Sequence, residues 1–241
     1  MARYRTSAWC AALWLATLAW PANAQTIVDL ELVIAVDSSA SIDDHEFTLQ
    51  TAGIAAAFRD PDVIAAIGSG PEARIAVTAM FWAEPGWPVD ATPWHVISDA
   101  GGAEDFAGMI ESWPRRVEGG TGIGSAVFNG VRLIEDNQLS SPRQVIDISG
   151  DGRETPMREF YITVDQGRAI AMSRGVTVNG LAMLYDEPDL DAYYRDEVIG
   201  GPDAFLMVAN RVEDFAAAMR RKLLREIEYQ PMISQWIDDS Q

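Results

Sequence analysis

The sequence predicts an α/β protein with a doubly wound, mostly parallel six-stranded sheet and helices on both faces. Short apolar stretches that are typical of buried strands alternate with helical patterns along the chain. No repeat, low-complexity run or long linker divides these elements, which indicates a single domain. The predicted strands cover residues 30–36, 74–82, 94–97, 143–149, 176–184 and 204–208.

The order of these strands follows from the Rossmann-like class. Such sheets commonly take the order 3-2-1-4-5-6, counted along the chain. Residues 94–97 follow residues 74–82 after a short break at residues 84–88, which predicts that the third strand is antiparallel. In this order the first and fourth strands are neighbours, about 4.8 Å apart. Side chains that follow these two strands should therefore face one small volume.

Helical spacing of apolar residues lies between the strands. The predicted helices cover residues 43–58, 62–67, 103–113, 121–137, 161–174, 191–199 and 212–228. Ser41 is expected to cap the first helix, whose first turn holds Asp43, Asp44 and Glu46, where the helix dipole favours acids. A basic cluster lies toward the end of the last helix, where cations are favoured, although a contact site is the alternative. It consists of Arg220, Arg221, Lys222 and Arg225.

The N-terminal segment resembles a secretory signal peptide. Arg3 and Arg5 precede an apolar run at residues 8–20, and the run ends in Ala22-Asn23-Ala24. The run is short for a transmembrane helix, and a retained anchor would leave the A-x-A end unexplained. We therefore expect a signal peptide at 1–24, one domain at 25–228 and a tail at 229–241. The mature protein should be periplasmic or secreted, without an integral membrane segment.

Composition excludes several classes of function. The net charge is −18, and it becomes −20 when the two arginines of the signal segment are removed, so nucleic acid is an unfavourable partner. Lys222 is the only lysine, which excludes a P-loop and Ser–Lys catalysis. The only cysteine is Cys10, inside the signal segment, and the chain has only two histidines. A Cys-ligated or multi-His metal site is therefore excluded.

Three short motifs place oxygen-bearing side chains at strand and helix boundaries. Asp37-x-Ser39-x-Ser41 follows the first strand, Thr121 lies in a Gly-Gly-Thr-Gly-Ile-Gly loop before a helix, and Asp151-Gly152 follows the fourth strand. The first motif alone would occur by chance in about 5% of chains of this length. Its conjunction with the other two is far more specific. A strand end with a helix cap, and a plain helix start, are the structural alternatives.

Together these motifs resemble the metal-ion-dependent adhesion site (MIDAS) of von Willebrand factor A (vWA) domains, and the resemblance covers essentially the whole mature chain. The segments 145–152 and 176–182 more narrowly resemble exported bacterial vWA-type proteins of unknown function. The resemblance implies one vWA domain whose metal ligands are Asp37, Ser39, Ser41, Thr121 and Asp151.

Hydroxyl and carboxylate oxygens suit hard cations, so Mg²⁺ is expected, with Mn²⁺ or Ca²⁺ as alternatives. By resemblance, the cation would bind a carboxylate of a protein or peptide ligand, and the protein would be a non-enzymatic binding module. The alternatives are a metal-dependent, phosphatase-like hydrolase and a scaffold with a purely structural ion. A hydrolase would lack its general acid or base, because no lysine or histidine follows a strand end.

Four residues are candidates for the rim of the ligand surface. They are Trp82, Trp87, Asp43 and Asp44. Packing in the core or in a hairpin is the favoured alternative for the two tryptophans. His45 is expected to be a surface residue. By resemblance only, residues 212–228 could shift when a ligand binds.

Overall fold

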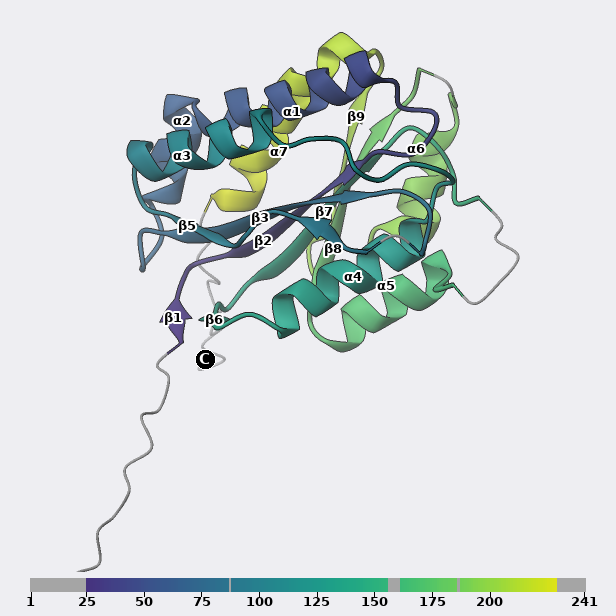
Figure 1. The fold of residues 1–241 in the computed structure, drawn as a ribbon. Coiled ribbons are helices and arrows are strands. Elements are labelled where there is room, and N and C mark those ends of the chain that lie inside the picture. Colours follow the sequence, from purple (N-terminus) through teal and green to yellow (C-terminus); the bar gives the residue numbers. More distant parts are fainter. Residues whose placement is uncertain (1–24, 87, 156–160, 186, 229–241) are drawn as a thin grey trace, which may run out of the picture.

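The computed structural model describes residues 25–86, 88–155, 161–185 and 187–228. It has a mixed α/β fold in which a central sheet lies between two helical layers, as Figure 1 shows. Helices α1, α2, α3 and α7 cover one face, and α4 and α5 cover the other. No helix in the described part of the chain is long and apolar enough to cross a membrane. The predicted signal segment and the predicted tail lie outside the described residues.

Within the described residues, the central sheet has seven strands. Its path runs β4-β3-β2-β7-β8-β9, and β5 also pairs with β3. The pairs β3–β2, β2–β7, β7–β8 and β8–β9 are parallel, whereas β4 and β5 are antiparallel to β3. The strands are β2 (Glu31–Asp37), β3 (Ile75–Trp82), β4 (Asp90–Ala91), β5 (His95–Ile97), β7 (Gln144–Gly150), β8 (Thr177–Met183) and β9 (Leu206–Ala209).

The prediction of six strands was incomplete at this edge. The segment after β3 forms two short strands, β4 and β5, which pair with opposite ends of β3. Pro85, Gly86 and Pro88 interrupt strand pairing between β3 and β4, because proline lacks a backbone N–H donor. Residues 92–94 separate the pairing of β4 from that of β5. A second, two-stranded parallel sheet pairs β1 (Thr26–Ile27) with β6 (Leu139–Ser140). Two-residue strands carry too short an apolar pattern to be predicted from sequence.

The helices follow the predicted order. They are α1 (Asp44–Phe58), α2 (Pro61–Ile67), α3 (Ala100–Glu111), α4 (Ile123–Glu135), α5 (Val164–Ser173), α6 (Leu190–Tyr193) and α7 (Phe215–Ile227). A π-helical turn, η1 (Tyr194–Val198), continues α6, and a 3₁₀ turn, η2 (Val212–Asp214), precedes α7. The four long strands β2, β3, β7 and β8 are almost entirely buried, and each face of the sheet contributes to its own apolar core.

The cap of α1 corrects one prediction. Asp43, not Ser41, caps the helix: its carboxylate accepts a hydrogen bond from the Glu46 backbone N–H at 2.8 Å. The Glu46 side chain in turn accepts from the Asp43 backbone N–H, which completes a capping box. The Ser41 hydroxyl instead donates to Asp151. The motif therefore separates two tasks, since Asp43 starts the helix and Ser41 stays available at the strand ends.

The basic cluster of the last helix is also placed differently from the prediction. Lys222 is fully buried, and its Nζ lies 2.9 Å from Asp147 Oδ1 on β7 and 2.5 Å from Glu226 Oε1 one turn along α7. Arg220 pairs instead with Asp60 and Asp62 at the surface. The only lysine of the chain thus fixes the last helix to the middle of the sheet.

Two carboxylates share this one buried ammonium group. Burial, together with the charge of Glu226, raises the pKa of Asp147 from its usual 3.8 to about 7, and Lys222 offsets only part of this rise. Between pH 3.8 and about pH 7, Asp147 therefore keeps its proton in the folded protein but has released it in the unfolded chain. The contribution of Asp147 to the free energy of unfolding therefore falls as the pH rises from about 4 to about 7.

We expect Asp147→Asn to remove this part of the pH dependence. Urea denaturation of the metal-free protein from pH 4 to pH 8 measures it as the difference between the wild-type and variant curves. Asp105→Asn, which changes an exposed acid of α3, should give a curve parallel to the wild type. Parallel curves for wild type and Asp147→Asn would contradict the assignment, whatever the absolute stability of the variant.

Candidate metal centre

The turn after β2 brings the hydroxyls of the first motif beside a buried carboxylate. Asp37 ends β2, is fully buried, and its Oδ1 accepts from the Ser39 backbone N–H at 2.7 Å. The Ser39 and Ser41 hydroxyl oxygens lie 3.1 Å apart. Ser39 is buried and Ser41 is exposed, so the turn connects the interior to solvent. Alternate residues of the motif therefore place their oxygens on the same side of the turn.

Asp151 joins this turn from the neighbouring strand. It directly follows β7, which pairs with β2 in parallel, and its Oδ1 accepts from the Ser41 hydroxyl at 2.8 Å. Asp151 is 1% exposed. The two strand-terminal acids predicted from the sequence thus meet at one edge of the sheet, with the hydroxyls of Ser39 and Ser41 between them.

The loop that carries Thr121 lies against the same turn. The Gly119 carbonyl accepts from the Ala40 backbone N–H at 2.8 Å, and Gly119 has φ +110°. A side chain at Gly119 would both strain this backbone and clash with Glu84, which explains the glycine. The Thr121 hydroxyl faces Gly152, since a Cβ built there would lie 4.0 Å from Thr121 Oγ1. The structure therefore brings all five predicted ligand residues to one edge.

Arg115 was missed by the sequence analysis. Its guanidinium donates to the carbonyl oxygens of Ser38 and Ser39 at 3.2 and 3.1 Å, and to the Ser38 hydroxyl at 3.2 Å. It also pairs with Asp44 at 2.9 Å and lies over the ring of Phe47. One side chain from the loop before α4 therefore holds the backbone of the first motif. No local pattern marks this role, because the contact spans 76 or more positions of sequence.

Glu154 is a second residue that the sequence analysis did not single out. Its two carboxylate oxygens accept from the backbone N–H groups of Gly124 and Val164, each at 3.0 Å. These groups belong to the first turns of α4 and α5, where a negative charge also complements the helix dipoles. Thr155 adds two hydrogen bonds to the backbone of Thr121. The segment after Asp151 thus fixes the Thr121 loop.

The electrostatics of the site centre on Asp37. Burial, together with the charge of Asp151, raises the pKa of the Asp37 carboxyl from 3.8 to about 7. Asp37 Oδ2 is buried and has no hydrogen-bond partner among the described residues. No Lys, Arg or His in the described ranges forms an ion pair with Asp37. An ionised Asp37 would therefore have no positively charged partner among the described residues.

The donor set fits a hard divalent cation. Two carboxylates and three hydroxyls supply oxygen ligands only, which are typical of Mg²⁺, Mn²⁺ and Ca²⁺ sites. The described residues contain no group of three or more His, Cys, Asp or Glu side chains that could hold a metal. Any cation here would therefore depend on the serine and threonine hydroxyls as much as on the acids.

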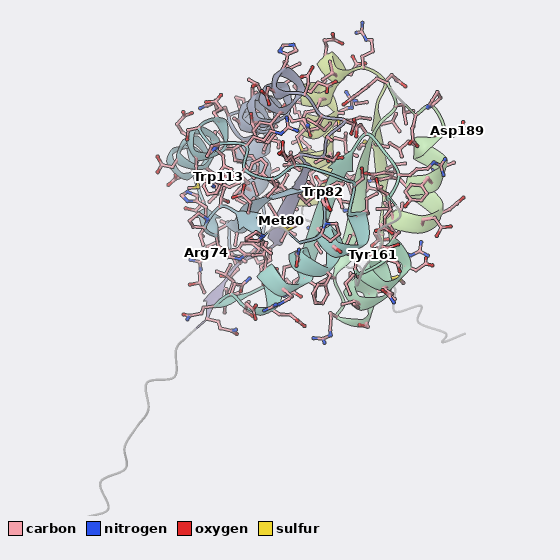
Figure 2. All side chains as sticks on the ribbon, turned by 45° about the vertical axis from the view of Figure 1, so that its right-hand side comes forward. Arg74, Met80, Trp82, Trp113, Tyr161 and Asp189 are labelled. Carbon is pink, nitrogen blue, oxygen red and sulfur yellow. The ribbon has the colours of Figure 1, made fainter. Side chains whose placement is uncertain are left out.

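The predicted rim residues have different surroundings. Trp82 is only 5% exposed and lies inside the molecule, near the centre of Figure 2. Asp43 and Asp44 are exposed at the start of α1, where Asp43 caps the helix and Asp44 pairs with Arg115. Trp87 lies outside the described residues.

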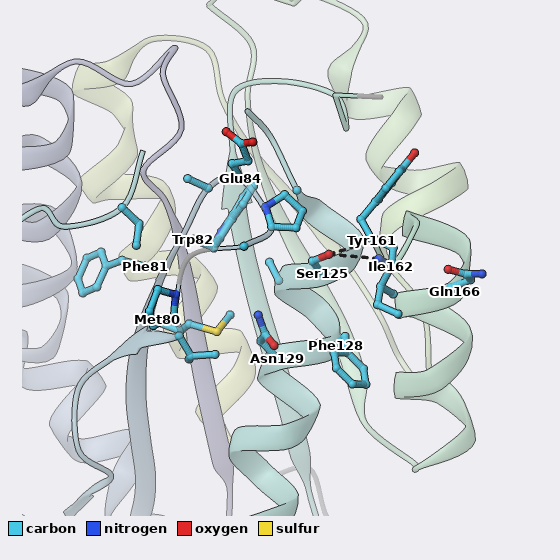
Figure 3. Close-up of a pocket in the computed structure, with 18 residues that line it drawn as sticks. Met80, Phe81, Trp82, Glu84, Ser125, Phe128, Asn129, Tyr161, Ile162 and Gln166 are labelled. Atoms are coloured by element: carbon cyan, nitrogen blue, oxygen red, sulfur yellow. Dashed lines mark hydrogen bonds between the residues drawn. The ribbon is translucent and has the colours of Figure 1, made fainter. Parts of the chain in front are cut away.

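A cavity of about 690 Å³ opens beside the site. The end of β3 and the following loop form one wall, α4 forms a second, and Tyr161 and Ile162 close the far side, as Figure 3 shows. Trp82 lines the cavity and is the register partner of Asp37, and Gly122 lines it directly after Thr121. Among the described residues that line it, Glu84 is the only charged one. The cavity is therefore largely apolar, and its lining includes direct neighbours of Asp37 and Thr121 rather than the predicted ligands themselves.

Comparison with solved structures identifies the fold. The chain is similar to the vWF domain of the type V pili tip protein Mfa5 from Porphyromonas gingivalis, with TM-score 0.55 and 10% identity over 84% of this chain and 97% of that one. It is also similar to the pilus adhesin SpaC from Lactobacillus rhamnosus GG, with TM-score 0.57 and 12% identity over 84% of this chain and 31% of that one. The central sheet and its helical layers are thus of the vWA type.

A third similar protein is the proximal thread matrix protein 1 from the mussel byssus. In the structure with a zinc-occupied MIDAS motif, the TM-score is 0.54 and the identity 13%, over 84% of this chain and 48% of that one. This chain spans less than half the length of the mussel protein and about a third of SpaC. Identities this low establish the fold alone.

Comparison with sequences gives the family. No curated protein matches the chain. A family model described as "Protein of unknown function (DUF1194)" matches residues 27–231, which is most of the chain. The chain therefore belongs to the DUF1194 family, a family of vWA-like fold in this representative.

Proposed function

We propose that this protein is an exported, non-enzymatic vWA-type binding module that holds a divalent cation and recognises a carboxylate of a protein or peptide ligand. Asp37, Ser39, Ser41, Thr121 and Asp151 are the proposed metal ligands. Mg²⁺ is the proposed cation, since several neutral hydroxyls with retained waters suit its octahedral preference. Export rests on the sequence of residues 1–24.

The observation that carries this proposal is the unpartnered, buried oxygen of Asp37. Burying an ionised carboxylate without a positive partner is costly, and the raised pKa of Asp37 expresses that cost. A divalent cation would supply the missing charge. The Ser39 and Ser41 hydroxyls, which lie between the two acids, would complete the oxygen shell.

Each of the five proposed ligand residues would have a defined role at this site. Asp37 and Asp151 would provide charge, and the hydroxyls would provide neutral donors that leave the cation electrophilic. A bound cation with mostly neutral ligands can exchange a water for a carboxylate oxygen of a partner. The exposed Ser41 marks the side from which that carboxylate would arrive.

The first test is the titration of Mg²⁺ and Mn²⁺ into the purified protein by calorimetry. We expect saturable binding at one site for the wild type and loss of that binding in Asp37→Asn, which keeps the side-chain volume and removes the charge. Asp43→Asn is the matched control, because it also removes one negative charge near the site. Asn is as good a helix cap as Asp, so α1 should remain capped.

The control variant should bind Mg²⁺ within about threefold of the wild type, since exposed charges are screened by salt. Equal losses in Asp37→Asn and Asp43→Asn would indicate diffuse electrostatic attraction and contradict a coordinated ion. Absence of wild-type binding would contradict the proposed function itself.

Arg115→Ala tests whether the first motif must be held in place. Removing a positive charge near a cation site should strengthen cation binding by Coulomb's law alone. We expect the opposite, a rise of about tenfold or more in the Mg²⁺ dissociation constant, because the Ser38 and Ser39 carbonyls lose the guanidinium that holds them both. Arg116→Ala removes the same charge from an exposed arginine that pairs with Asp90 and should leave the constant within about twofold. Tighter binding by Arg115→Ala would show that charge, not position, is what Arg115 contributes.

The cavity beside the site defines a second part of the ligand. Its walls are largely apolar and its only charged described residue is acidic, so it disfavours an anionic group. An aromatic or long aliphatic side chain next to the ligand carboxylate would fit it. The acidic group would then face the cation, and the apolar group would pack against Trp82 and Phe128.

Two peptide probes test this arrangement in the presence of saturating Mg²⁺. We expect N-acetyl-Asp-Phe-amide to bind at least about tenfold tighter than N-acetyl-Asp-Ala-amide, as burial of one aromatic side chain contributes about 1.5–3 kcal/mol. Two-dimensional NMR titration measures both affinities. Asn129→Trp, which fills the cavity from α4, should remove the difference and leave Mg²⁺ affinity unchanged. Equal affinities of the two probes in the wild type would contradict the role of the cavity.

A further inference from the structure

Three buried polar atoms without hydrogen-bond partners lie around Gly150, at the end of β7. They are Asp37 Oδ2, Trp82 Nε1 and Tyr194 Oη, and none has a partner in the part of the chain that the structure describes. A Cβ built on Gly150 would lie 2.5 Å from Tyr194 Oη and 2.9 Å from Asp37 Oδ2. The same point is 3.3 Å from Trp82 Cζ2, on the ring edge that carries the indole N–H. One acceptor and two donors thus converge from three elements.

Burying these three polar atoms lowers the stability of the fold unless they form hydrogen bonds in the functional state. Asp37 and Tyr194 are fully buried and Trp82 is 5% exposed, and an unsatisfied buried polar group typically costs about 1–3 kcal/mol. Native proteins contain few such groups, so three around one glycine indicate a common task. Tyr194 also begins a π-helical turn, a local feature that often occurs at functional sites.

The chemistry of the two donors fits the acceptor. Burial, with the charges of Asp37 and Asp151, raises the pKa of Tyr194 well above its usual value, so its hydroxyl keeps its proton. The Trp82 indole N–H can only donate. Asp37 and Trp82 are register partners on neighbouring strands, so their backbones hold the two side chains at one level of the sheet.

We propose that Tyr194 and Trp82 are positioning residues for the cation site, and that their O–H and N–H groups donate to the Asp37 carboxylate, directly or through one water, when that carboxylate faces a bound cation. This inference rests on the proposed function. Two donors on the far side of the carboxylate would fix its orientation toward the cation. Gly150 is explained as well, because a methyl group there would occupy the space between Asp37 and Tyr194.

Two measurements on Tyr194→Phe, the metal-free melting temperature and the Mg²⁺ dissociation constant, distinguish a positioning role from simple packing. In the metal-free protein the Tyr194 hydroxyl has no partner, so Tyr194→Phe removes a buried polar group at little cost. We expect its metal-free melting temperature to equal or exceed that of the wild type. Its Mg²⁺ dissociation constant should nevertheless rise about 10- to 100-fold, as is typical when a group that orients a metal ligand is removed.

The experiment combines Mg²⁺ calorimetry and thermal melting of the purified wild type, Tyr194→Phe and Tyr193→Phe. Tyr193 is the matched control, since its hydroxyl accepts from the Glu154 backbone N–H at 3.4 Å. Its Mg²⁺ constant should stay within about threefold of the wild type. A second measurement follows the Trp82 indole N–H by NMR, assigned with Trp82→Phe, which should move downfield when Mg²⁺ is added.

Each outcome decides between the two hypotheses. If the wild type binds Mg²⁺ and Tyr194→Phe binds equally well, this inference is overturned and the proposed function stands. A weaker constant accompanied by a lower metal-free melting temperature would show a structural role and also overturn it, as would a Trp82 resonance that does not move. If the wild type does not bind Mg²⁺ or Mn²⁺, the proposed function fails and this inference fails with it.

Discussion

The organisation of this protein depends on the meeting of two acidic side chains at the ends of two adjacent parallel strands. Parallel pairing of β2 with β7 places Asp37 and Asp151 at the same edge of the sheet. Both are buried, and the charge of Asp151 disfavours the ionisation of Asp37. Strand pairing across the whole sheet fixes this proximity, so the surrounding loops must satisfy the oxygens that the strands bring together.

The loops at this edge are accordingly joined to one another by hydrogen bonds. Arg115 holds the backbone after β2, Glu154 joins the starts of α4 and α5, and the Gly119 carbonyl accepts from Ala40. The Arg115 and Gly119 contacts both join the turn after β2 to the loop before α4, whereas Glu154 joins the segment after β7 to the starts of two helices. A binding site whose ligands sit on loops gains precision only when such contacts lock the loops to rigid elements. Here the rigid elements are β2, β7 and the N-terminal turns of two helices.

The sequence predicts the features that are local and misses those that depend on distant contacts. The strand ends, the hydroxyls at alternate positions and the Thr121 loop were visible because each is a short pattern beside an apolar run. Arg115 and Tyr194 were invisible because their roles arise from contacts across many tens of residues. Lys222 was misread for a related reason. Its position near a helix end suggests a surface cation, and only the packing of α7 on β7 shows the buried acids that it meets.

Smaller errors have the same origin. Ser41 looked like a helix cap because it precedes acids and an apolar spacing, and Asp43 fits that pattern equally well two positions later. The competition is decided by Asp151, 110 residues away, which takes the Ser41 hydroxyl. The presence of a polar cap at a helix start can therefore be predicted from sequence. The exact residue that forms the cap cannot, where a distant partner competes for one of the candidate side chains.

Asp37 and Asp147 show two ways of burying an acid. Burial raises the pKa of both Asp37 and Asp147 to about 7. Asp147 lies beside Lys222, so the chain supplies its counter-charge from its own last helix. Asp37 has a second acid as its neighbour and no cationic side chain paired with it in the described residues, although the chain was able to provide one at Asp147. Arg115 approaches the same turn yet donates only to carbonyl and hydroxyl oxygens and to the exposed Asp44. Lys222 thus compensates the charge of Asp147 in part, whereas Asp37 has no such partner among the described residues and, under the proposed function, would receive its positive charge from a bound cation.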